Sequence, residues 1–207
     1  MRKIIIIGAS GFGEEVAWLI ARCNAHAPAF EVLGFCDDAA DKQAGVFGAY
    51  PLLGPVESVA KRFGAVGFIC AVGNNMARQS LTLRAVAEGH APATVIDPSA
   101  VVAPGVVIGD GSVIGIGSVV STGARFGAGV LVNHQVTVGH EVTVGDFAQL
   151  CPGVRVSGGC VLGEGALLGS NACTIPCVRV GAWATAGAGT AVLRDIQDGG
   201  SLIRLGR

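Results

Sequence analysis

A six-residue repeat of large apolar positions dominates the second half of the chain. Every sixth residue from Ile96 to Val192 is large and apolar in fifteen of seventeen cases, and only Thr174 and Ala186 depart. An α-helical face would recur every 3.6 residues, so a period of six excludes it. The period indicates a parallel β-helix, in which each hexapeptide forms one short strand and one corner. Three hexapeptides complete a triangular coil, and residues 18 apart stack about 4.8 Å apart.

The residue that follows the apolar position is glycine in nine of sixteen repeats. We expect these glycines to supply a positive φ at the corner, because glycine adopts that conformation without steric cost. Asn133 and Asp97 fall in the same column and tolerate this conformation better than other non-glycine residues. The fifth position is always small or β-branched and is expected to fill space beside the next apolar residue.

The first part of the chain has a different pattern, in which apolar runs alternate with amphipathic stretches. This alternation predicts a small parallel sheet with helical crossovers, a Rossmann-like α/β domain. The expected strands are residues 3–7, 32–36, 65–72 and 93–95, and the expected helices are 14–23 and 76–88. We therefore expect an α/β domain at 1–92 and an all-β left-handed parallel β-helix at 93–207, the handedness being implied only by the resemblance given below.

Composition excludes several classes of function. The 207 residues carry a net charge of −1, and only 14% are charged, which argues against a nucleic-acid or polybasic membrane partner. No apolar run reaches the length of about 18 that a membrane span needs, and the N-terminus lacks the pattern of a secretory leader. We expect a cytoplasmic protein whose seven cysteines are reduced thiols.

Two histidines, His134 and His140, occur in the repeat region, both at the third position of a hexapeptide, where side chains project outward. His140 precedes Glu141 and stacks between Thr122 and Gly158 of the adjacent coils. A histidine beside a carboxylate is a general-base arrangement, because the carboxylate holds the tautomer and stabilises the imidazolium. The pair alone is also compatible with solvated surface residues. His134 is interpreted as a surface imidazole near a subunit interface.

A glycine-rich turn, Gly8-Ala-Ser-Gly-Phe-Gly13, follows the first strand and precedes a helix. Such a turn can present backbone N–H groups to a phosphate at the helix N-terminus. Its glycine order is not that of the dinucleotide fingerprint G-x-G-x-x-G. Asp37 and Asp38, at the end of the second strand, suit hydrogen bonding to a base or ribose. The alternative is that the glycines only allow close packing of helix on strand.

A metal centre is not expected. Zinc needs three or four convergent ligands, whereas the repeat region has two histidines, and Cys173-x-x-x-Cys177 has no second pair to complete a set. No cysteine adjoins a histidine or a basic cluster that would activate it as a nucleophile.

Five segments together resemble one family of hexapeptide-repeat acyltransferases, the sialic acid O-acetyltransferases and nucleotide-amino-sugar N-acetyltransferases. The resemblance covers nearly the whole chain. The segments are Gly8-Ala-Ser-Gly-Phe-Gly13, Gly34-Phe-Cys-Asp-Asp38, Ala71-Val-Gly-Asn-Asn75, His140-Glu-Val-Thr-Val-Gly-Asp-Phe147 and Gly187-Ala-Gly-Thr-Ala-Val192.

The resemblance implies a left-handed β-helix that forms homotrimers and uses acetyl-CoA as co-substrate, without a metal. His140 would be the general base, Glu141 would raise its basicity, and the Gly158 N–H would stabilise the oxyanion. Gln149, Ser170 and Ala188 would contact acetyl-CoA. The nucleotide-sugar acceptor would bind Gly8, Ser10, Gly11, Phe12, Asp37, Asp38 and Gly73.

The chain departs from the family at two of these positions, since Gln149 and Phe12 each replace a histidine. The function expected is acetyl transfer to an amino or hydroxyl group of a nucleotide-linked or free sugar. Two alternatives stay open, an acyltransferase for a non-sugar acceptor and a non-catalytic trimeric nucleotide-binding scaffold.

Overall fold

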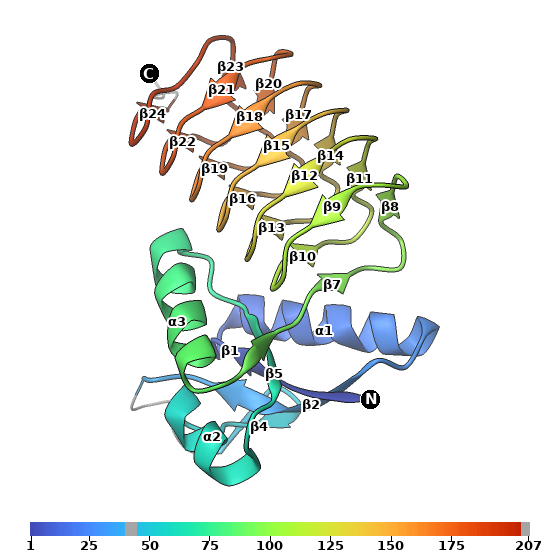
Figure 1. Ribbon diagram of the computed structural model, residues 1–207, viewed down its shortest axis with the longest axis vertical. Helices are drawn as coiled ribbons and strands as arrows, with labels where there is room; N and C mark the ends of the chain where they lie inside the picture. Colours follow the sequence, from blue (N-terminus) through green and yellow to red (C-terminus); the bar gives the residue numbers. More distant parts are fainter. Residues whose placement is uncertain (40–44, 204–207) are drawn as a thin grey trace. The chain divides into compact units, whose positions relative to one another are not determined.

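The computed structural model describes residues 1–39 and 45–203 (Figure 1). Contacts within the chain divide it into two compact units, Met1–Val95 and Ile96–Arg207. The division lies three residues beyond the boundary expected from the sequence. Among the described residues, no helix combines the length and the apolar character that crossing a membrane requires.

The N-terminal unit contains a four-stranded parallel sheet with strand order β2-β1-β5-β6. Ile4 to Ile7 are at most 2% exposed, because strand β1 lies between two neighbours and is covered on both faces. A short antiparallel hairpin, β3–β4, and helix α2 were not predicted. The elements are β1 (Arg2–Ile7), α1 (Gly11–His26), β2 (Phe30–Cys36), β3 (Val46–Phe47), β4 (Tyr50–Pro51), α2 (Val56–Phe63), β5 (Gly67–Cys70), α3 (Asn75–Ala87) and β6 (Ala91–Pro92).

The C-terminal unit is the predicted β-helix, with a two-residue strand every six residues and pairs 18 residues apart. Its strands form three parallel sheets, which we name after their first strands. The β7 face comprises β7 (Val95–Ile96), β10 (Val113–Ile114), β13 (Leu131–Val132), β16 (Gln149–Leu150), β19 (Leu167–Leu168), β22 (Thr185–Ala186) and β24 (Ser201–Leu202). The β8 face comprises β8 (Val101–Val102), β11 (Val119–Val120), β14 (Thr137–Val138), β17 (Arg155–Val156), β20 (Cys173–Thr174) and β23 (Ala191–Val192). The β9 face comprises β9 (Val107–Ile108), β12 (Arg125–Phe126), β15 (Thr143–Val144), β18 (Val161–Leu162) and β21 (Arg179–Val180).

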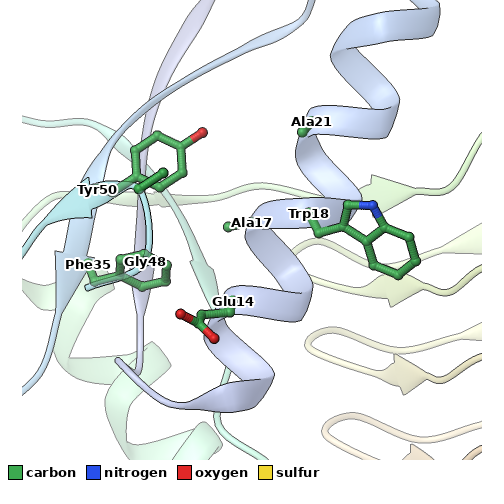
Figure 2. A pocket seen from close by; sticks show the side chains of 8 residues that line it. Glu14, Ala17, Trp18, Ala21, Phe35, Gly48 and Tyr50 are labelled. Atoms are coloured by element: carbon green, nitrogen blue, oxygen red, sulfur yellow. The ribbon is translucent and has the colours of Figure 1, made fainter. Parts of the chain in front are cut away.

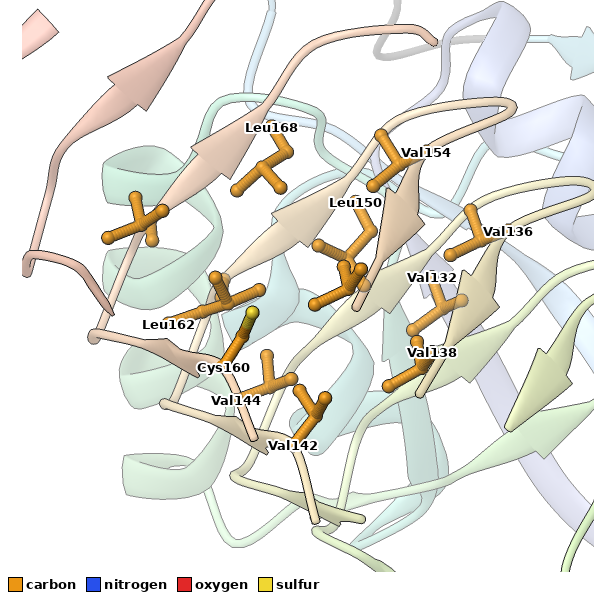
Figure 3. Close-up of a cluster of buried hydrophobic side chains, with 14 of the residues drawn as sticks. Val132, Val136, Val138, Val142, Val144, Leu150, Val154, Cys160, Leu162 and Leu168 are labelled. Atoms are coloured by element: carbon orange, nitrogen blue, oxygen red, sulfur yellow. The ribbon is translucent and has the colours of Figure 1, made fainter. Parts of the chain in front are cut away.

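The repeated apolar residues fill the interior of the prism. The second residue of nearly every strand points inward, and Val132, Leu150 and Leu168 stack in successive coils of the β7 face (Figure 3). Small or β-branched residues such as Val142 and Cys160 occupy the corners beside them and are fully buried. The interior is therefore closed, and chemistry has to take place on the outside of the prism.

The expected reason for the corner glycines is wrong. Positive φ occurs at the third residue after the inward-pointing one, as at Gly159 (φ 69°), and not at the first. The glycines at the first position are needed for a different reason, which is the close approach of adjacent coils. A Cβ on Gly115 would lie 2.8 Å from the carbonyl carbon of Asn133, and one on Gly139 would lie 2.6 Å from the nitrogen of Gly158.

Side chains at the left-handed corners lie on glycines of the preceding coil. A Cβ on Gly123 would lie 3.3 Å from Cγ of Glu141, and one on Gly165 would lie 2.5 Å from Cδ2 of Trp183. Each corner column can thus hold a side chain only where the coil before it has a glycine.

The last coil is shorter than the others by two residues. Ser201 pairs with Thr185, 16 residues earlier, and Ile196 pairs with Val180. Two aspartates compensate for the shorter coil by accepting backbone hydrogen bonds from the coil before it. The carboxylate of Asp195 accepts the N–H of Arg179 at 2.8 Å, and that of Asp198 accepts the N–H of Ala182 at 2.9 Å.

Candidate functional site

His140 lies at the corner between the β8 and β9 faces, in the turn from β14 to β15. Its Nδ1 is 3.4 Å from Oε2 of Glu141, and the two side chains are 65% and 77% exposed. Glu141 has φ 57°, which folds its side chain back toward Gly123. With the proton on Nδ1 donated toward the carboxylate, Nε2 carries the lone pair that a base needs.

Gly158 lies under the imidazole, one coil further along. A Cβ at this position would lie 2.6 Å from Cε1 and 2.9 Å from Cδ2 of His140, so the ring can lie there only above a glycine. The Gly158 carbonyl accepts from Cys177 N at 3.0 Å, whereas the described residues offer its N–H no acceptor. A free backbone donor therefore adjoins the candidate base.

Three residues predicted to contact acetyl-CoA lie elsewhere on the prism. Ser170 and Ala188 stack at the corner between the β7 and β8 faces, and Gln149 projects from β16. Gln149 Nε2 donates to Cys151 Sγ at 3.6 Å, and its buried Oε1 has no partner within the described residues. Within one chain, the β8 face separates Ser170 and Ala188 from His140.

Three residues of the predicted acceptor site line one pocket of about 170 Å³ in the N-terminal unit. Gly8, Asp37 and Asp38 surround it where strands β1 and β2 end. Asp37 Oδ2 accepts the N–H of Ala9 at 2.9 Å, so this carboxylate also holds the glycine turn in place. Burial raises the pKa of the Cys36 thiol at the pocket wall to about 12, with smaller contributions from Asp38, Glu57 and Asp37.

The glycines of this site divide into two kinds. Gly8 is required by the fold, because its φ is 107° and a Cβ would lie 2.8 Å from the carbonyl oxygen of Ala71. A Cβ on Gly11 or Gly73 would meet no heavy atom within 4 Å beyond those of neighbouring residues in the chain, and neither glycine has a positive φ. Packing therefore explains Gly8 but leaves open space at Gly11 and Gly73, where a ligand can approach the backbone.

The start of α1 has unused backbone donors. Ser10 occupies the N-cap position but makes no side-chain cap hydrogen bond. The N–H groups of Gly11 and Phe12 find no acceptor among the described residues, because the first bond of the helix runs from Glu14 N to Ser10 O at 3.0 Å. Such a helix start suits an anionic group.

Comparison with known proteins shows the family to which the chain belongs. The PglD N-terminal domain family matches residues 3–85. The acetyltransferase domain of PglB from Neisseria gonorrhoeae, solved with acetyl coenzyme A, is 35% identical, with a TM-score of 0.86 over 98% of this chain and 96% of that one. PerB from Caulobacter crescentus, solved with CoA and GDP-perosamine, is 30% identical, with a TM-score of 0.88 over 98% and 94%. The chain belongs to the hexapeptide-repeat sugar N-acetyltransferases.

WeeI from Acinetobacter baumannii shares the fold of this acetyltransferase at 23% identity, with a TM-score of 0.88 over 98% of this chain and 97% of that one. No curated protein sequence matches the chain. The described residues include no group of three or more histidine, cysteine, aspartate or glutamate side chains that could hold a metal ion.

Sequence reasoning missed Arg84 of the acetyltransferase. Its guanidinium bridges Asp38 Oδ2 at 2.6 Å and Glu57 Oε1 at 2.7 Å. The hydrogen bond from Arg84 lowers the pKa of Glu57. Arg84 lies 46 residues from Asp38 along the chain, and no local motif marks it.

A second pocket in the N-terminal unit of the acetyltransferase lies between α1 and the β3–β4 hairpin (Figure 2). It is lined mainly by apolar side chains, and Phe35 packs edge-on against Tyr50 at 6.1 Å. None of the predicted site residues line it.

Proposed function

We propose that this protein transfers an acetyl group from acetyl-CoA to the amino group of a nucleotide-linked sugar, with His140 as the general base. The observation that carries the proposal is the position of the His140 imidazole, which lies against Gly158 on one side and is oriented by Glu141 at Nδ1. The acetyl-CoA bound to the PglB acetyltransferase domain and the GDP-perosamine bound to PerB support the donor and the class of acceptor.

The chemistry is a direct transfer. The acceptor amine attacks the thioester carbonyl carbon while His140 Nε2 takes the proton that the amine loses. The carbonyl oxygen becomes an oxyanion beside the free N–H of Gly158, which stabilises it. The carbon–sulfur bond then breaks, the imidazolium returns its proton to the CoA thiolate, and the products are the acetamido sugar and CoA.

The acceptor site in this proposal is the pocket at Gly8, Asp37 and Asp38, together with the open helix start at Ser10 and Gly11. The backbone N–H groups at the helix start would bind phosphate, and Asp38 would accept a hydrogen bond from base or ribose. Phe12 and Gly73 complete the set predicted from the sequence.

We propose that the working form is a homotrimer with acetyl-CoA between neighbouring prisms. Ser170 and Ala188 lie at a different corner from His140, so one ligand can touch both sets only if a second copy brings the corners together. A cyclic trimer uses two different surfaces of each subunit. Exposed valines flank the His140 corner on both sides, with Val119 at 42% on the β8 face and Val161 at 36% on the β9 face. Gln149 would contact the donor from the β7 face.

The cytoplasm is the compartment we propose, because it supplies the acetyl-CoA that the reaction consumes.

The test is thiol release from acetyl-CoA in the presence of UDP-, GDP- and dTDP-linked amino sugars. We expect turnover with at least one of them and the loss of most of it in His140→Gln, with CoA affinity retained. His26→Gln, which removes an exposed histidine at the end of α1, serves as the control and should match the wild type. Unchanged turnover in His140→Gln would refute the role of His140 as the general base. An absence of any stabilisation by CoA would favour a non-catalytic scaffold.

A further inference from the structure

Thr174 is the polar exception among the seventeen positions that recur every six residues and point into the prism. It is the second residue of β20 and is 6% exposed, and a buried hydroxyl is costly unless it is hydrogen-bonded. Its Oγ1 accepts the N–H of Ser157 at 2.9 Å and lies 3.2 Å from Sγ of Cys160, one of the interior side chains in Figure 3. Because the Cys160 thiol itself donates to the carbonyl of Ile175 at 3.3 Å, the Thr174 hydroxyl donates to its sulfur. The hydroxyl thus both accepts and donates.

The hydrogen bond from Ser157 to this hydroxyl replaces a backbone bond of the regular coils. At the same corner one coil earlier, Gly139 donates its N–H to the carbonyl of Val156 at 2.8 Å. Ser157 donates instead to the Thr174 side chain, and its own Oγ donates to the Thr174 carbonyl at 2.5 Å. The pairing of β17 with β20 accordingly includes only the first residue of each strand, whereas β14 with β17 and β20 with β23 pair along both residues. The ladder of the β8 face is interrupted at this corner.

Gly158, whose N–H is the proposed oxyanion donor, directly follows the interruption. This N–H belongs to the peptide that joins Gly158 to Ser157, and a peptide is planar, so the orientation of Ser157 sets the direction of the N–H. Thr174 holds Ser157 at both its N–H and its hydroxyl, and the N–H of Cys177 holds the carbonyl of Gly158 at 3.0 Å. The donor is thereby fixed from both sides, although its own hydrogen has no acceptor among the described residues.

We propose that Ser157 and Thr174 are positioning residues, which direct the N–H of Gly158 toward the oxygen of the thioester. The inference rests on the proposed function, because that function assigns the oxyanion to Gly158. A backbone donor stabilises an oxyanion from about 2.7–3.1 Å, and it acts on the transition state more than on the bound substrate. Thr174 itself lies inside the prism, so its contribution falls on kcat and reaches the reaction only through Gly158.

Thr174→Val tests the proposal, because it keeps the branched shape of the side chain and removes the hydroxyl. The N–H of Ser157 then has the carbonyl of residue 174 as its remaining acceptor, as in the regular coils, and the peptide before Gly158 rotates. We expect kcat to fall about tenfold and KM for acetyl-CoA to change by less than about twofold. Thr174→Ser keeps the hydroxyl and should retain most of kcat. Ser157→Ala should lower kcat several-fold, because it removes the second of the two side-chain hydrogen bonds.

A donor with an altered carbonyl separates the role of the Gly158 N–H from that of the base. Dithioacetyl-CoA carries sulfur in place of the thioester oxygen, and sulfur is a weak hydrogen-bond acceptor. With this donor the direction of the N–H has little effect on the rate. The wild type and Thr174→Val should therefore release thiol from dithioacetyl-CoA at similar rates, whereas they differ with acetyl-CoA.

Ser112→Ala is the matched control, since Ser112 also links two coils through a buried hydroxyl, at the corner between the β9 and β7 faces. Its Oγ accepts the N–H of Val130 at 3.1 Å and donates to the carbonyl of Gly127 at 3.2 Å. The variant should lower the melting temperature, because buried hydrogen bonds are lost, and should leave kcat unchanged. A hydroxyl with only a structural role at Thr174 would give the same result.

Wild-type kcat in Thr174→Val would overturn the proposal, as would a loss in Thr174→Ser as large as that in Thr174→Val. An equal loss with both donors would also overturn it and assign the effect to His140. If Thr174→Val does not fold, Ser157→Ala decides, since a lowered kcat supports the proposal and an unchanged one overturns it. Failure of the proposed function is distinct, because the wild type itself would then release no thiol from acetyl-CoA.

Discussion

The imidazole of His140 lies on the backbone of Gly158, one coil further along the β-helix, so that a methyl group at 158 would lie 2.6 Å from its Cε1 atom. The two residues are 18 residues apart in the sequence, and one full coil of the β-helix brings them together. Their juxtaposition places the proposed base and a backbone donor on the same side of one corner. Small changes at Gly158 therefore test the proposed site without altering the side chain of His140 itself.

Gly158→Ala is expected to lower kcat by about 100-fold, because the added methyl displaces the imidazole by roughly an ångström. Stability should change little, since His140 is 65% exposed and its ring can rotate into solvent. Steady-state kinetics and thermal unfolding measure the two effects. Gly159→Ala is the control. With φ 69° and a Cβ that would lie 3.0 Å from Cys177 Sγ, it should cost about 1–3 kcal/mol of stability, while the added methyl would not contact His140. Equal kcat values for the two variants would contradict the geometry.

Gly165→Ala should destabilise the fold by about 2–4 kcal/mol, the sum of a left-handed alanine and a clash with Trp183. A built Cβ at 165 lies 2.5 Å from Cδ2 of the indole. Gly189→Ala is the matched control, because it has φ 65° and open space around its Cβ, so it carries only the backbone cost. Urea unfolding gives the free energy of unfolding of both variants, and the difference between their losses is the steric cost of the contact with Trp183. Similar losses would show that Trp183 moves aside freely.

The sequence predicts the architecture well because the six-residue period is repeated in every coil but the last. It predicts less well why particular glycines are present. A glycine in the sequence does not distinguish a positive φ from a close approach of two backbones, and the first-position glycines serve the second purpose. Gly8 and Gly11 show the same ambiguity, which only the space around each residue resolves.

Long-range polar contacts were also beyond prediction. His140 and Glu141 are adjacent and could be recognised as a pair, whereas Arg84 meets Asp38 and Glu57 only after helix α3 packs against its neighbours. Helix α2 escaped prediction because its eight residues are too short to establish a period. In the trimer that we propose, Ser170 and Ala188 of one chain meet His140 of another, and no single sequence describes such a contact.

Two buried thiols should make the protein less stable in alkali. Burial raises the pKa of Cys36 to about 12 and that of Cys70 to about 11, from 9.0. Both are protonated below pH 9 in either state, so their stabilising contribution is complete there. Above pH 9 only the unfolded chain loses the protons, and stability falls by up to about 1.4 kcal/mol per pH unit for each thiol.

Urea unfolding at pH 8, 9, 10 and 11 measures this slope. Cys36→Ala removes one thiol and should show a shallower decline than the wild type, whatever its stability at pH 8. Parallel declines would mean that Cys36 ionises as readily in the folded chain as in the unfolded one.

Arg84→Gln is expected to raise KM for the nucleotide sugar several-fold and to leave KM for acetyl-CoA and kcat unchanged. The arginine fixes Asp38 through a 2.6 Å ion pair at the predicted acceptor pocket, and without it the carboxylate can adopt several rotamers. Stability should change by less than about 1 kcal/mol, because Arg84 is 38% exposed and exposed pairs contribute little. Arg62→Gln, at an exposed arginine of α2 that packs on Phe63, is the control. If acetyl-CoA, and not the nucleotide sugar, showed the higher KM in Arg84→Gln, this pocket would belong to the donor, and the acceptor would have to bind elsewhere.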